Sequence, residues 1–182
     1  MTPGLRVLVV PKWYPWPDRP VLGAFVREHA RALARQHEVV VLASRATPAP
    51  GFALFRLEDD REDGLRTLRV HYRRPRFRPA AMACQIAGLL AGLWRLRRAG
   101  FKPDVVHAHV YSAALPALLL GRLAGAVVVV TEHYTGFGRG LVTGADRWVA
   151  RAAFSRADLV APVSEELAGH LLSFLGRCLP GV

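Results

Sequence analysis

Apolar and polar residues along the chain form blocks whose lengths predict strands separated by helices. Short runs rich in β-branched residues are apolar at nearly every position, as expected for strands that are covered on both faces of a sheet. A weaker run, Leu68–Tyr72, alternates in character, which indicates a strand near the edge of the sheet. The predicted buried strands are Arg6–Val10, Val39–Ala43, Val105–Ala108, Val127–Thr131 and Leu159–Val163.

Helical patterns fill the intervals between these strands. In Gly23–Gln36 the apolar residues share one side of the helix, while Arg27, Arg31 and Arg35 share the other. Alternation of strand and helix favours parallel pairing with right-handed crossovers. The predicted fold is therefore α/β, a Rossmann-like, doubly wound and mostly parallel sheet with helices on both faces. The remaining predicted helices are Ala80–Arg98, Ser112–Ala124, Ala145–Ser155 and Ser164–Leu175.

One long segment, Thr47–Gly64, shows neither pattern. It carries Pro48, Pro50 and a run of acidic residues between Glu58 and Asp63, so we expect a solvated surface excursion. The chain has 182 residues and no internal repeat, which fits one domain spanning 1–182.

Composition narrows the class of protein further. At 52% hydrophobic residues the chain is not of the disordered class. Met1–Pro15 has too short an apolar run for a secretory signal, and Pro79–Trp94 is shorter than the about 20 apolar residues that span a bilayer. Cys84 and Cys178 lack a CxxC partner, which indicates reduced structural thiols in a cytoplasmic protein.

The formal net charge of +11 favours anionic partners: nucleic acid, an anionic membrane surface or phosphorylated small molecules. Arginines cluster on both sides of the apolar run that begins at Pro79, so the region Arg69–Lys102 could dock on an anionic membrane face. An ordinary core helix with solvated arginines explains the same pattern equally well. The chain has no recognised nucleic-acid motif and no regular aromatic platform, so we expect no nucleic-acid partner.

Polar and aromatic residues follow the ends of several predicted strands. In open parallel sheets, ligands bind outside the carboxyl ends of the strands. The sequence therefore predicts a ligand site along one edge of the sheet. The residues concerned are Lys12 and Trp13, then His107 and His109, then Glu132, His133 and Tyr134, and finally Ser164 and Glu165.

Each of these positions has a functional and a structural interpretation. Gly23 would let backbone amides approach an anion at the start of a helix, or it is needed only for the turn. His133 could bind a sugar hydroxyl or exchange a proton, whereas a lone histidine is more often held by the backbone. Ser164 is expected to cap a helix, with a contact across the cleft as a second role. Lys12 could meet a phosphate, and Trp13 could wall a sugar or a lipid; loop packing explains both equally well.

His107 and His109 point to the same face of one strand and raise the question of a metal. No third ligand is spaced to join them, so a polar-site or packing role is preferred and no metal is expected. His109 lies nearer the strand end and is the better functional candidate. Motifs for other activities are absent: no GxGxxG follows the first strand, and neither a P-loop lysine motif nor a GxSxG elbow occurs.

Four stretches together resemble the N-terminal domain of family 4 glycosyltransferases, which have the two-domain GT-B architecture. They are Val7–Leu42, Pro103–Gly125, Val127–Phe137 and Ala157–Leu171, and their order and spacing make the match specific. The resemblance implies transfer with retention from a nucleotide-sugar to a glycan or lipid-linked acceptor, without a metal or other cofactor. It also implies that the reaction takes place between two Rossmann-like domains, of which the N-terminal one mainly holds the acceptor.

The resemblance assigns roles to individual residues. Gly23 and Ala24 would approach the donor phosphates through their backbone, and His133 would act near the reacting centre. His109 and Tyr134 would help to line the acceptor pocket. Lys12 and Trp13 are placed with this acceptor group, and Glu132, Ser164 and Glu165 line other parts of the cleft.

Two departures from the family pattern set the remaining expectations. Ala24 stands where the family often has a second glycine, and Cys178–Val182 resembles the strand and turn that lead into the second domain. We therefore expect the C-terminal, donor-binding domain to be absent and the chain alone to be inactive. The leading hypothesis is the acceptor-side half of a hexosyltransferase in cell-envelope glycan synthesis, cytoplasmic and peripheral on the inner face of the membrane. The alternative is a non-catalytic binding module or a subunit of a split transferase.

Overall fold

The computed structural model describes residues 4–47, 51, 54–62, 64–176 and 179–180. They form a seven-stranded sheet in the order β3-β4-β2-β1-β5-β6-β7. All neighbouring strands are parallel except β3 and β4, which are antiparallel. The strands are β1 (Arg6–Pro11), β2 (Glu38–Thr47), β3 (Phe55–Glu62), β4 (Leu65–Arg73), β5 (Val105–His109), β6 (Val127–Glu132) and β7 (Leu159–Pro162).

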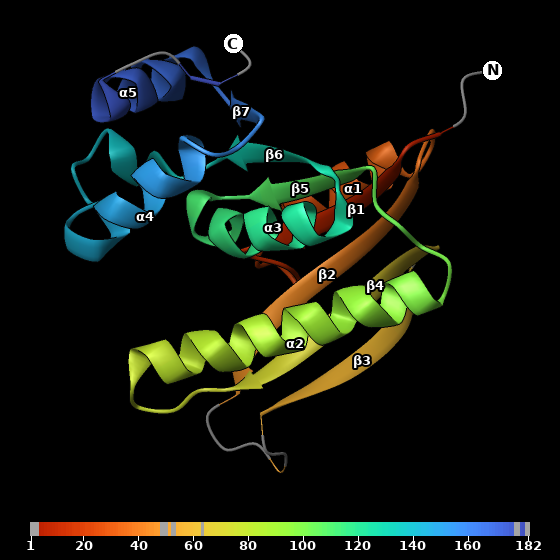
Figure 1. Ribbon diagram of the computed structural model, residues 1–182. Coiled ribbons are helices and arrows are strands. Elements are labelled where there is room, and N and C mark those ends of the chain that lie inside the picture. The colour runs from red at the N-terminus through yellow and green to blue at the C-terminus, as the bar shows by residue number, and fades with distance from the viewer. Residues whose placement is uncertain (1–3, 48–50, 52–53, 63, 177–178, 181–182) are drawn as a thin grey trace.

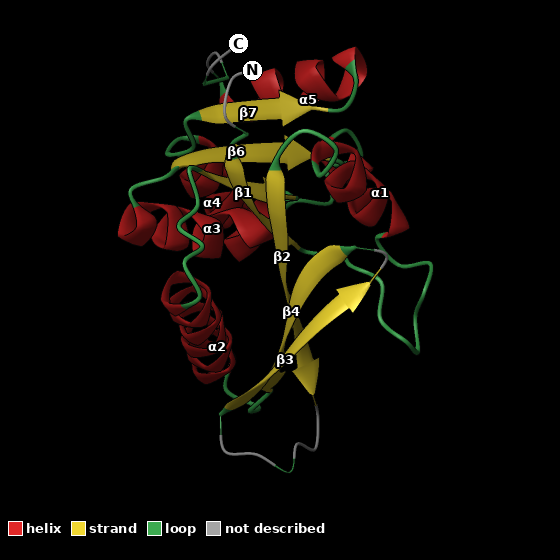
Figure 2. Ribbon diagram, turned by 90° about the vertical axis from the view of Figure 1, so that its right-hand side faces the viewer, coloured by secondary structure: helices red, strands yellow, loops and turns green. Residues whose placement is uncertain are grey.

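Helices cover both faces of this sheet, which confirms the doubly wound α/β fold. Figures 1 and 2 show α1 on one face, with α2, α3 and α4 on the other and α5 beside β7 at the end of the sheet. A short 3-10 helix, η1, follows β6. The bounds are α1 (Ala24–Leu33), α2 (Arg78–Arg98), α3 (Tyr111–Ala124), η1 (Thr135–Phe137), α4 (Gly144–Phe154) and α5 (Glu165–Leu175).

The central strands divide their side chains between two cores. In β1, Val7 and Val9 face the smaller core under α1, while Leu8 and Val10 face the larger core under α2 and α3. Strand side chains alternate between faces, so a strand that is covered on both sides must be apolar throughout. This is the physical reason that the continuous apolar runs predicted β1, β2, β5 and β6.

The prediction of a surface excursion over Thr47–Gly64 is wrong for Phe55–Glu62. Phe55–Glu62 forms β3, which pairs with β4 and makes the edge of the sheet, so that β4 is second from the edge. The acidic side chains of β3 pair with arginines of β4: Asp59 lies 2.8 Å from Arg66 and Glu62 lies 2.6 Å from Arg69. Pro48, Pro50 and Asp63 lie outside the described residues.

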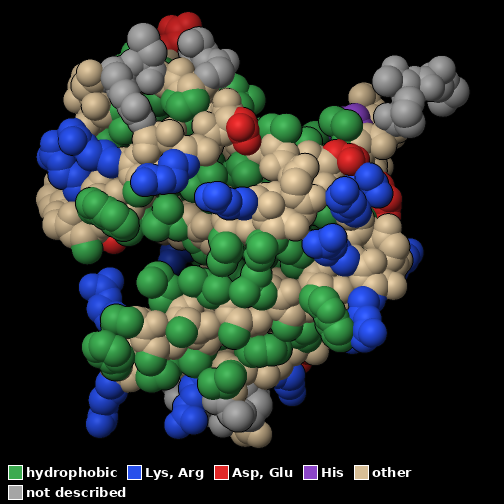
Figure 3. Space-filling model, viewed as in Figure 1, with side chains coloured by type: hydrophobic (Ala, Val, Ile, Leu, Met, Phe, Trp, Pro, Cys, Tyr) green, Lys and Arg blue, Asp and Glu red, His purple; other side chains and the backbone are tan. Residues whose placement is uncertain are grey.

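The long helix α2 owes its apolar character to its packing on the sheet. Among the described residues it is the one helix that is long and apolar enough to cross a membrane by length and composition. Its buried residues recur along one side, and a Cβ at Gly88 or at Gly92 would overlap Val70 or Leu42 of the sheet. The helix therefore lies close against β2 and β4. Figure 3 shows its outer side, where apolar side chains continue towards α3 among lysines and arginines.

Candidate functional site

The carboxyl ends of β1, β5, β6 and β7 lie side by side along one edge of the sheet. Pro11 is in register with His109, His109 with Thr131, and Glu132 with Pro162. The residues that follow these ends therefore gather on a common rim, as the sequence predicted. We call this edge the strand-end rim and build the site from it.

Gly23 is placed at the rim by the loop that follows β1. Its φ of 74° lies in the left-handed region, and a Cβ there would overlap the carbonyl of Trp13. Position 23 therefore requires glycine, because the backbone of Trp13 packs directly against it. The N-terminus of α1 has no side-chain cap and no acidic residue in its first turn, while the Ala24 N–H donates to the carbonyl of Val21 at 3.2 Å.

His109 and His133 form a hydrogen-bonded pair at the centre of the rim. Nδ1 of His109 lies 3.0 Å from Nε2 of His133, and the two rings stack. His109 is fully buried, and burial lowers its pKa to about 2; burial also lowers the pKa of the half-buried His133. Phe25 covers the His133 ring at 4.6 Å between ring centroids. Both imidazoles are therefore neutral at neutral pH, and His133 is the one that reaches solvent.

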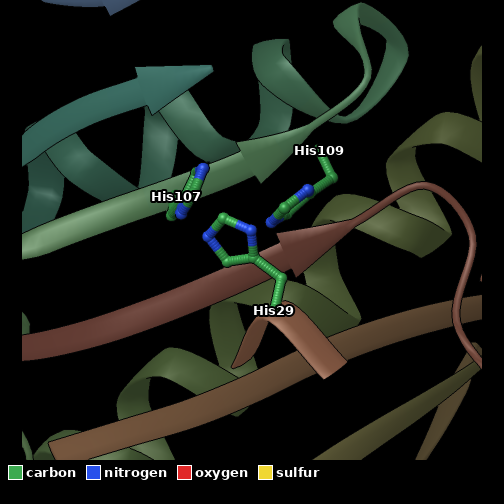
Figure 4. Close-up of side chains that lie close together, drawn as sticks. All are labelled: His29, His107 and His109. Carbon is green, nitrogen blue, oxygen red and sulfur yellow. The ribbon is translucent and has the colours of Figure 1, made fainter. Parts of the chain in front are cut away.

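A further histidine, His29, lies against this strand end and was not predicted from the sequence. His29 of α1 lies with its ring centroid 5.3 Å from that of His107 and 5.2 Å from that of His109 (Figure 4). The spacing along the chain hides this contact, because α1 crosses back over the ends of β1 and β5. Phe25 and His29 are spaced i, i+4, which puts both on the same side of α1. This spacing was the one sequence feature that could have placed His29 near the histidines.

Glu132 organises the backbone of the rim. Its buried carboxylate accepts hydrogen bonds from the backbone N–H groups of His133 at 2.9 Å and of Tyr134 and Tyr111 at 2.8 Å. Burial raises its pKa to about 7, against the lowering effect of these three donors. The residue before Tyr111, Val110, has a φ of 75°, a conformation that costs a β-branched residue free energy. Glu132 therefore fixes the strained start of α3 to the end of β6.

Aromatic side chains line the rim beside the histidines. The ring centroids of Trp13 and Tyr134 are 6.3 Å apart, and those of Tyr134 and Tyr111 are 6.2 Å apart. Lys12 is exposed, and its backbone N–H donates to the carbonyl of His109 at 3.2 Å. Tyr14 and Trp16, in contrast, are buried in the core under α1. Of the aromatic residues of this loop, Trp13 is the one that stays with the rim.

The end of β7 adds a hollow to the rim. Ser164 caps α5 by accepting a hydrogen bond from the Leu167 N–H at 3.2 Å, as predicted, and Glu165 lies exposed in the first turn. A cavity of about 420 Å³ lies beside Ser164, lined also by Thr135, Arg139, Glu166 and His170. Arg139 was not singled out from the sequence. Arg139 could have been recognised as the basic residue of the glycine-rich segment that follows β6.

Comparison with known proteins gives one family and a consistent fold. Residues 22–178 match the family described as Glycosyl transferase 4-like domain. Glycogen synthase of Mycobacterium tuberculosis is 29% identical over 183 residues, which covers 90% of this chain and 44% of that protein. The chain thus spans less than half the length of the curated relatives that it matches.

Solved structures agree with this fold. Sucrose-phosphate synthase from Thermosynechococcus elongatus matches with a TM-score of 0.60 and 15% identity, over 96% of this chain and 84% of the other. A trehalose-6-phosphate protein from E. coli bound with UDP-2-fluoro glucose matches with a TM-score of 0.55 and 12% identity, over 93% of this chain and 42% of the other. At these identities the likeness establishes the fold alone.

Proposed function

This chain belongs to the Glycosyl transferase 4-like family, and from that premise we propose that it is the acceptor-side half of a retaining hexosyltransferase. The donor would be a nucleotide-sugar and the acceptor a glycan or lipid-linked precursor of the cell envelope. The observation that carries the proposal is the strand-end rim, where the partly exposed His133 is hydrogen-bonded to the buried His109.

His133 is the group that would act on the reacting sugar. A neutral imidazole offers one N–H donor and one acceptor nitrogen, so it can hydrogen-bond a sugar hydroxyl or take up a proton. Phe25 and His109 hold its ring from two sides, which limits its rotation. A ring of fixed orientation can direct its hydrogen bond at the transition state of the reaction.

The donor phosphates would lie at the N-terminus of α1. A helix N-terminus attracts anions through its N–H groups and its dipole, and here no acidic side chain competes with the ligand. Gly23 and Ala24 would make the backbone approach. We propose that the developing negative charge on the leaving phosphate is stabilised in this way, and by basic groups of a second domain, with no metal in the transfer step.

The acceptor would lie on the aromatic side of the rim. Trp13 and Tyr134 are partly buried and lie edge to face, and Lys12 adds an exposed positive charge. Flat rings beside hydrogen-bonding groups suit a sugar, whose C–H face packs on aromatic carbons while its hydroxyls bond to polar atoms. Glu132 would contribute by shaping the backbone, and Ser164 and Glu165 would border the cleft.

Membrane contact is the second part of the proposal. Leu90, Leu93, Trp94 and Leu123 line an apolar groove between α2 and α3, with Arg97 and Arg98 at its margin. The guanidinium of Arg98 lies 4.3 Å from the ring centroid of Trp94. Apolar residues flanked by arginines suit the surface of an anionic bilayer, so we propose peripheral binding to the cytoplasmic face of the cell membrane.

A vesicle-sedimentation experiment tests this membrane contact. Binding to vesicles that contain an acidic lipid should exceed binding to neutral vesicles, fall as salt rises, and weaken in Trp94→Ala with Arg98→Gln. Trp148→Ala, an exposed tryptophan on α4, is the matched control. Binding that ignores lipid charge and salt would contradict the proposal and leave α2 as a core helix with solvated arginines.

Reconstitution tests the transferase itself. The second GT-B domain, supplied in the same polypeptide or as a separate chain, should be needed for transfer from nucleotide-sugars to lipid-linked acceptors. Activity from these 182 residues alone would show that they need no second domain.

A non-catalytic partner module is the second candidate. It is favoured by one observation: the Ala24 N–H is already bonded to the Val21 carbonyl, at the position where the family often has a second glycine. Titration with nucleotide-sugars in the presence of the second domain separates the two candidates. A module would leave donor affinity and transfer unchanged when it is added.

A further inference from the structure

His29, His107 and His109, which we call the histidine trio, meet beneath the strand-end rim. One ring nitrogen from each lies within 4.8 Å of the others. His107 and His109 are buried side chains of β5, and His29 is an exposed side chain of α1. Figure 4 shows the three rings turned towards one another from these two elements. The trio needs an explanation, because clustered imidazoles cannot all satisfy their nitrogens by bonding to one another.

His109 supplies the first indication of a ligand. Its Nε2 atom is buried and has no hydrogen-bond partner among the described residues. A buried nitrogen without a partner costs about 1–3 kcal/mol, so native structures rarely keep one. The atom belongs to a fully buried side chain that takes part in the trio. A bound cation would satisfy this lone pair.

The other nitrogens of the two buried rings are already held. Nε2 of His107 lies 2.7 Å from the hydroxyl oxygen of Thr131, and Nδ1 of His109 lies 3.0 Å from Nε2 of His133. In metal sites, the imidazole nitrogen that does not bind the metal is hydrogen-bonded in this way, which fixes the ring and its tautomer. Nδ1 of His107 and Nε2 of His109 are thus available without breaking either bond.

We propose that the histidine trio binds one divalent transition-metal ion of the Zn²⁺ class. Three neutral imidazoles, with no carboxylate or thiolate among the three, suit Zn²⁺ and its neighbours rather than Mg²⁺ or Ca²⁺, which prefer oxygen. With Zn–N bonds of about 2.0–2.1 Å, the nitrogens of a tetrahedral site lie about 3.4 Å apart. The trio would therefore contract on binding, and His29, on an exposed side of its helix, has the freedom to move.

The surroundings give the ion a route and a fourth ligand. A hollow of about 240 Å³ lies directly beside His29 and is lined also by Leu33, Gln36 and His37. His29 is the member of the trio that lines this hollow, so solvent meets the trio at His29, and a water molecule there would be the fourth ligand. Burial lowers the pKa of His107 to about 4, so that together with His109 it is unprotonated at neutral pH and binding need not displace a proton.

Metal binding would also fix the tautomer of His133. With the ion on Nε2 of His109, the proton of that ring lies on Nδ1 and is donated to Nε2 of His133. His133 then keeps its own proton on Nδ1. The ion is thus a positioning element for the rim, and its binding can be measured independently of any transferase activity.

Metal titration of the tag-free chain tests the proposal. After removal of metal with a chelator, calorimetric titration with Zn²⁺ should give one site per chain, and Co²⁺ should give the visible absorption of a nitrogen-coordinated, four- or five-coordinate ion. His29→Ala is the diagnostic variant, because an exposed helical position accepts alanine without loss of folding. It should weaken binding at least about tenfold.

His170→Ala is the matched control, because it also removes a partly exposed histidine from a helix. It should bind Zn²⁺ as the unaltered chain does. The proposal is overturned if the unaltered chain shows no stoichiometric site, if His29→Ala binds equally well, or if the control loses as much affinity. Circular dichroism of each variant confirms that the fold is retained.

Discussion

The two halves of the sheet are built from different chemistry. The half formed by β1, β5, β6 and β7 has short apolar strands, and apart from Arg6 its polar side chains lie in the second half of β5 and β6, towards the carboxyl ends. The half formed by β2, β4 and β3 has longer strands, and charged residues pair across its antiparallel edge. The first half thus gathers its polar side chains at the strand-end rim, while the second half carries ion pairs along the β3–β4 edge. Damage to the first half should therefore affect function, and damage to the second mainly stability.

Replacement of His133 should give the largest effect. In a complete enzyme, His133→Ala should lower kcat by about 10²–10³-fold, because a preorganised hydrogen-bond donor at the reacting group contributes that much. Thermal unfolding should change little, since the ring is only half-buried. Steady-state kinetics of the two proteins measures this loss. A near-normal kcat would reduce His133 to a packing role.

Gly23→Ala should be the most damaging change to the fold of the rim. A left-handed φ costs alanine about 1–2 kcal/mol, and its Cβ would overlap the Trp13 carbonyl, so a loss of about 3 kcal/mol is expected. Urea unfolding measures it. Gly169→Ala is the control: it lies within α5 with open space around its Cβ, and should stabilise by up to about 1 kcal/mol. Equal stability of the two variants would refute the backbone clash.

Glu132 should give this half of the sheet a pH dependence. Its pKa is raised to about 7 in the folded chain from an ordinary value near 4.5, so the fold favours the protonated form. The stabilisation is complete below about pH 4.5 and is lost as pH rises to about 7, by at most about 3 kcal/mol. The buried histidines act in the opposite direction, because a lowered pKa makes stability rise with pH, so urea unfolding at pH 5 and pH 8 is compared between the unaltered chain and a variant that lacks the Glu132 carboxyl.

Glu132→Gln is the matched variant for that measurement. It cannot titrate, so its stability should lack the fall that Glu132 contributes between pH 5 and pH 8, and the difference between the two proteins isolates that fall. The amide nitrogen cannot accept a hydrogen bond, so the variant should also be less stable than the unaltered chain at pH 5. An identical pH profile in both proteins would assign the dependence to other groups.

Removal of a single carboxylate charge from the charged half, as in Asp59→Asn, should have a small effect. Hydrogen bonding to Arg66, with a further contribution from Arg95, lowers the pKa of Asp59. Exposed ion pairs contribute only about 0.2–1 kcal/mol, so the loss should be of that size and should shrink in high salt. Asp60→Asn, whose carboxylate lies 3.4 Å from Arg69, should cost less still. A large loss that does not depend on salt would mean that the pairing is not electrostatic.

The same contrast explains what the sequence could predict. Strands buried on both faces carry their own signal, so β1, β5 and β6 and the gathering of His109 and His133 followed from apolar runs alone. The strand β3 did not, because its residues are charged and its stabilising partners lie on β4. The residue pattern of β3 alone does not show that arginines of β4 will lie opposite its carboxylates.

Two features of the site were hidden for related reasons. His29 joins the trio through a crossover that brings α1 onto β5, and no spacing along the chain encodes that contact. Gly23 was predicted to admit a ligand, yet the group that fills the space of its missing Cβ is the backbone of Trp13. Whether it also admits a phosphate stays a prediction.

The charged edge strand has a consequence for how the protein behaves in concentrated solution. Unpaired strand edges are templates on which other chains can add and aggregate. Along β3 that edge presents closely spaced carboxylates and guanidinium groups, which a second strand would have to desolvate. At the opposite edge, the Val160 N–H of β7 is already bonded to the Pro180 carbonyl at 3.1 Å. The sheet thus discourages edge-to-edge association at both sides.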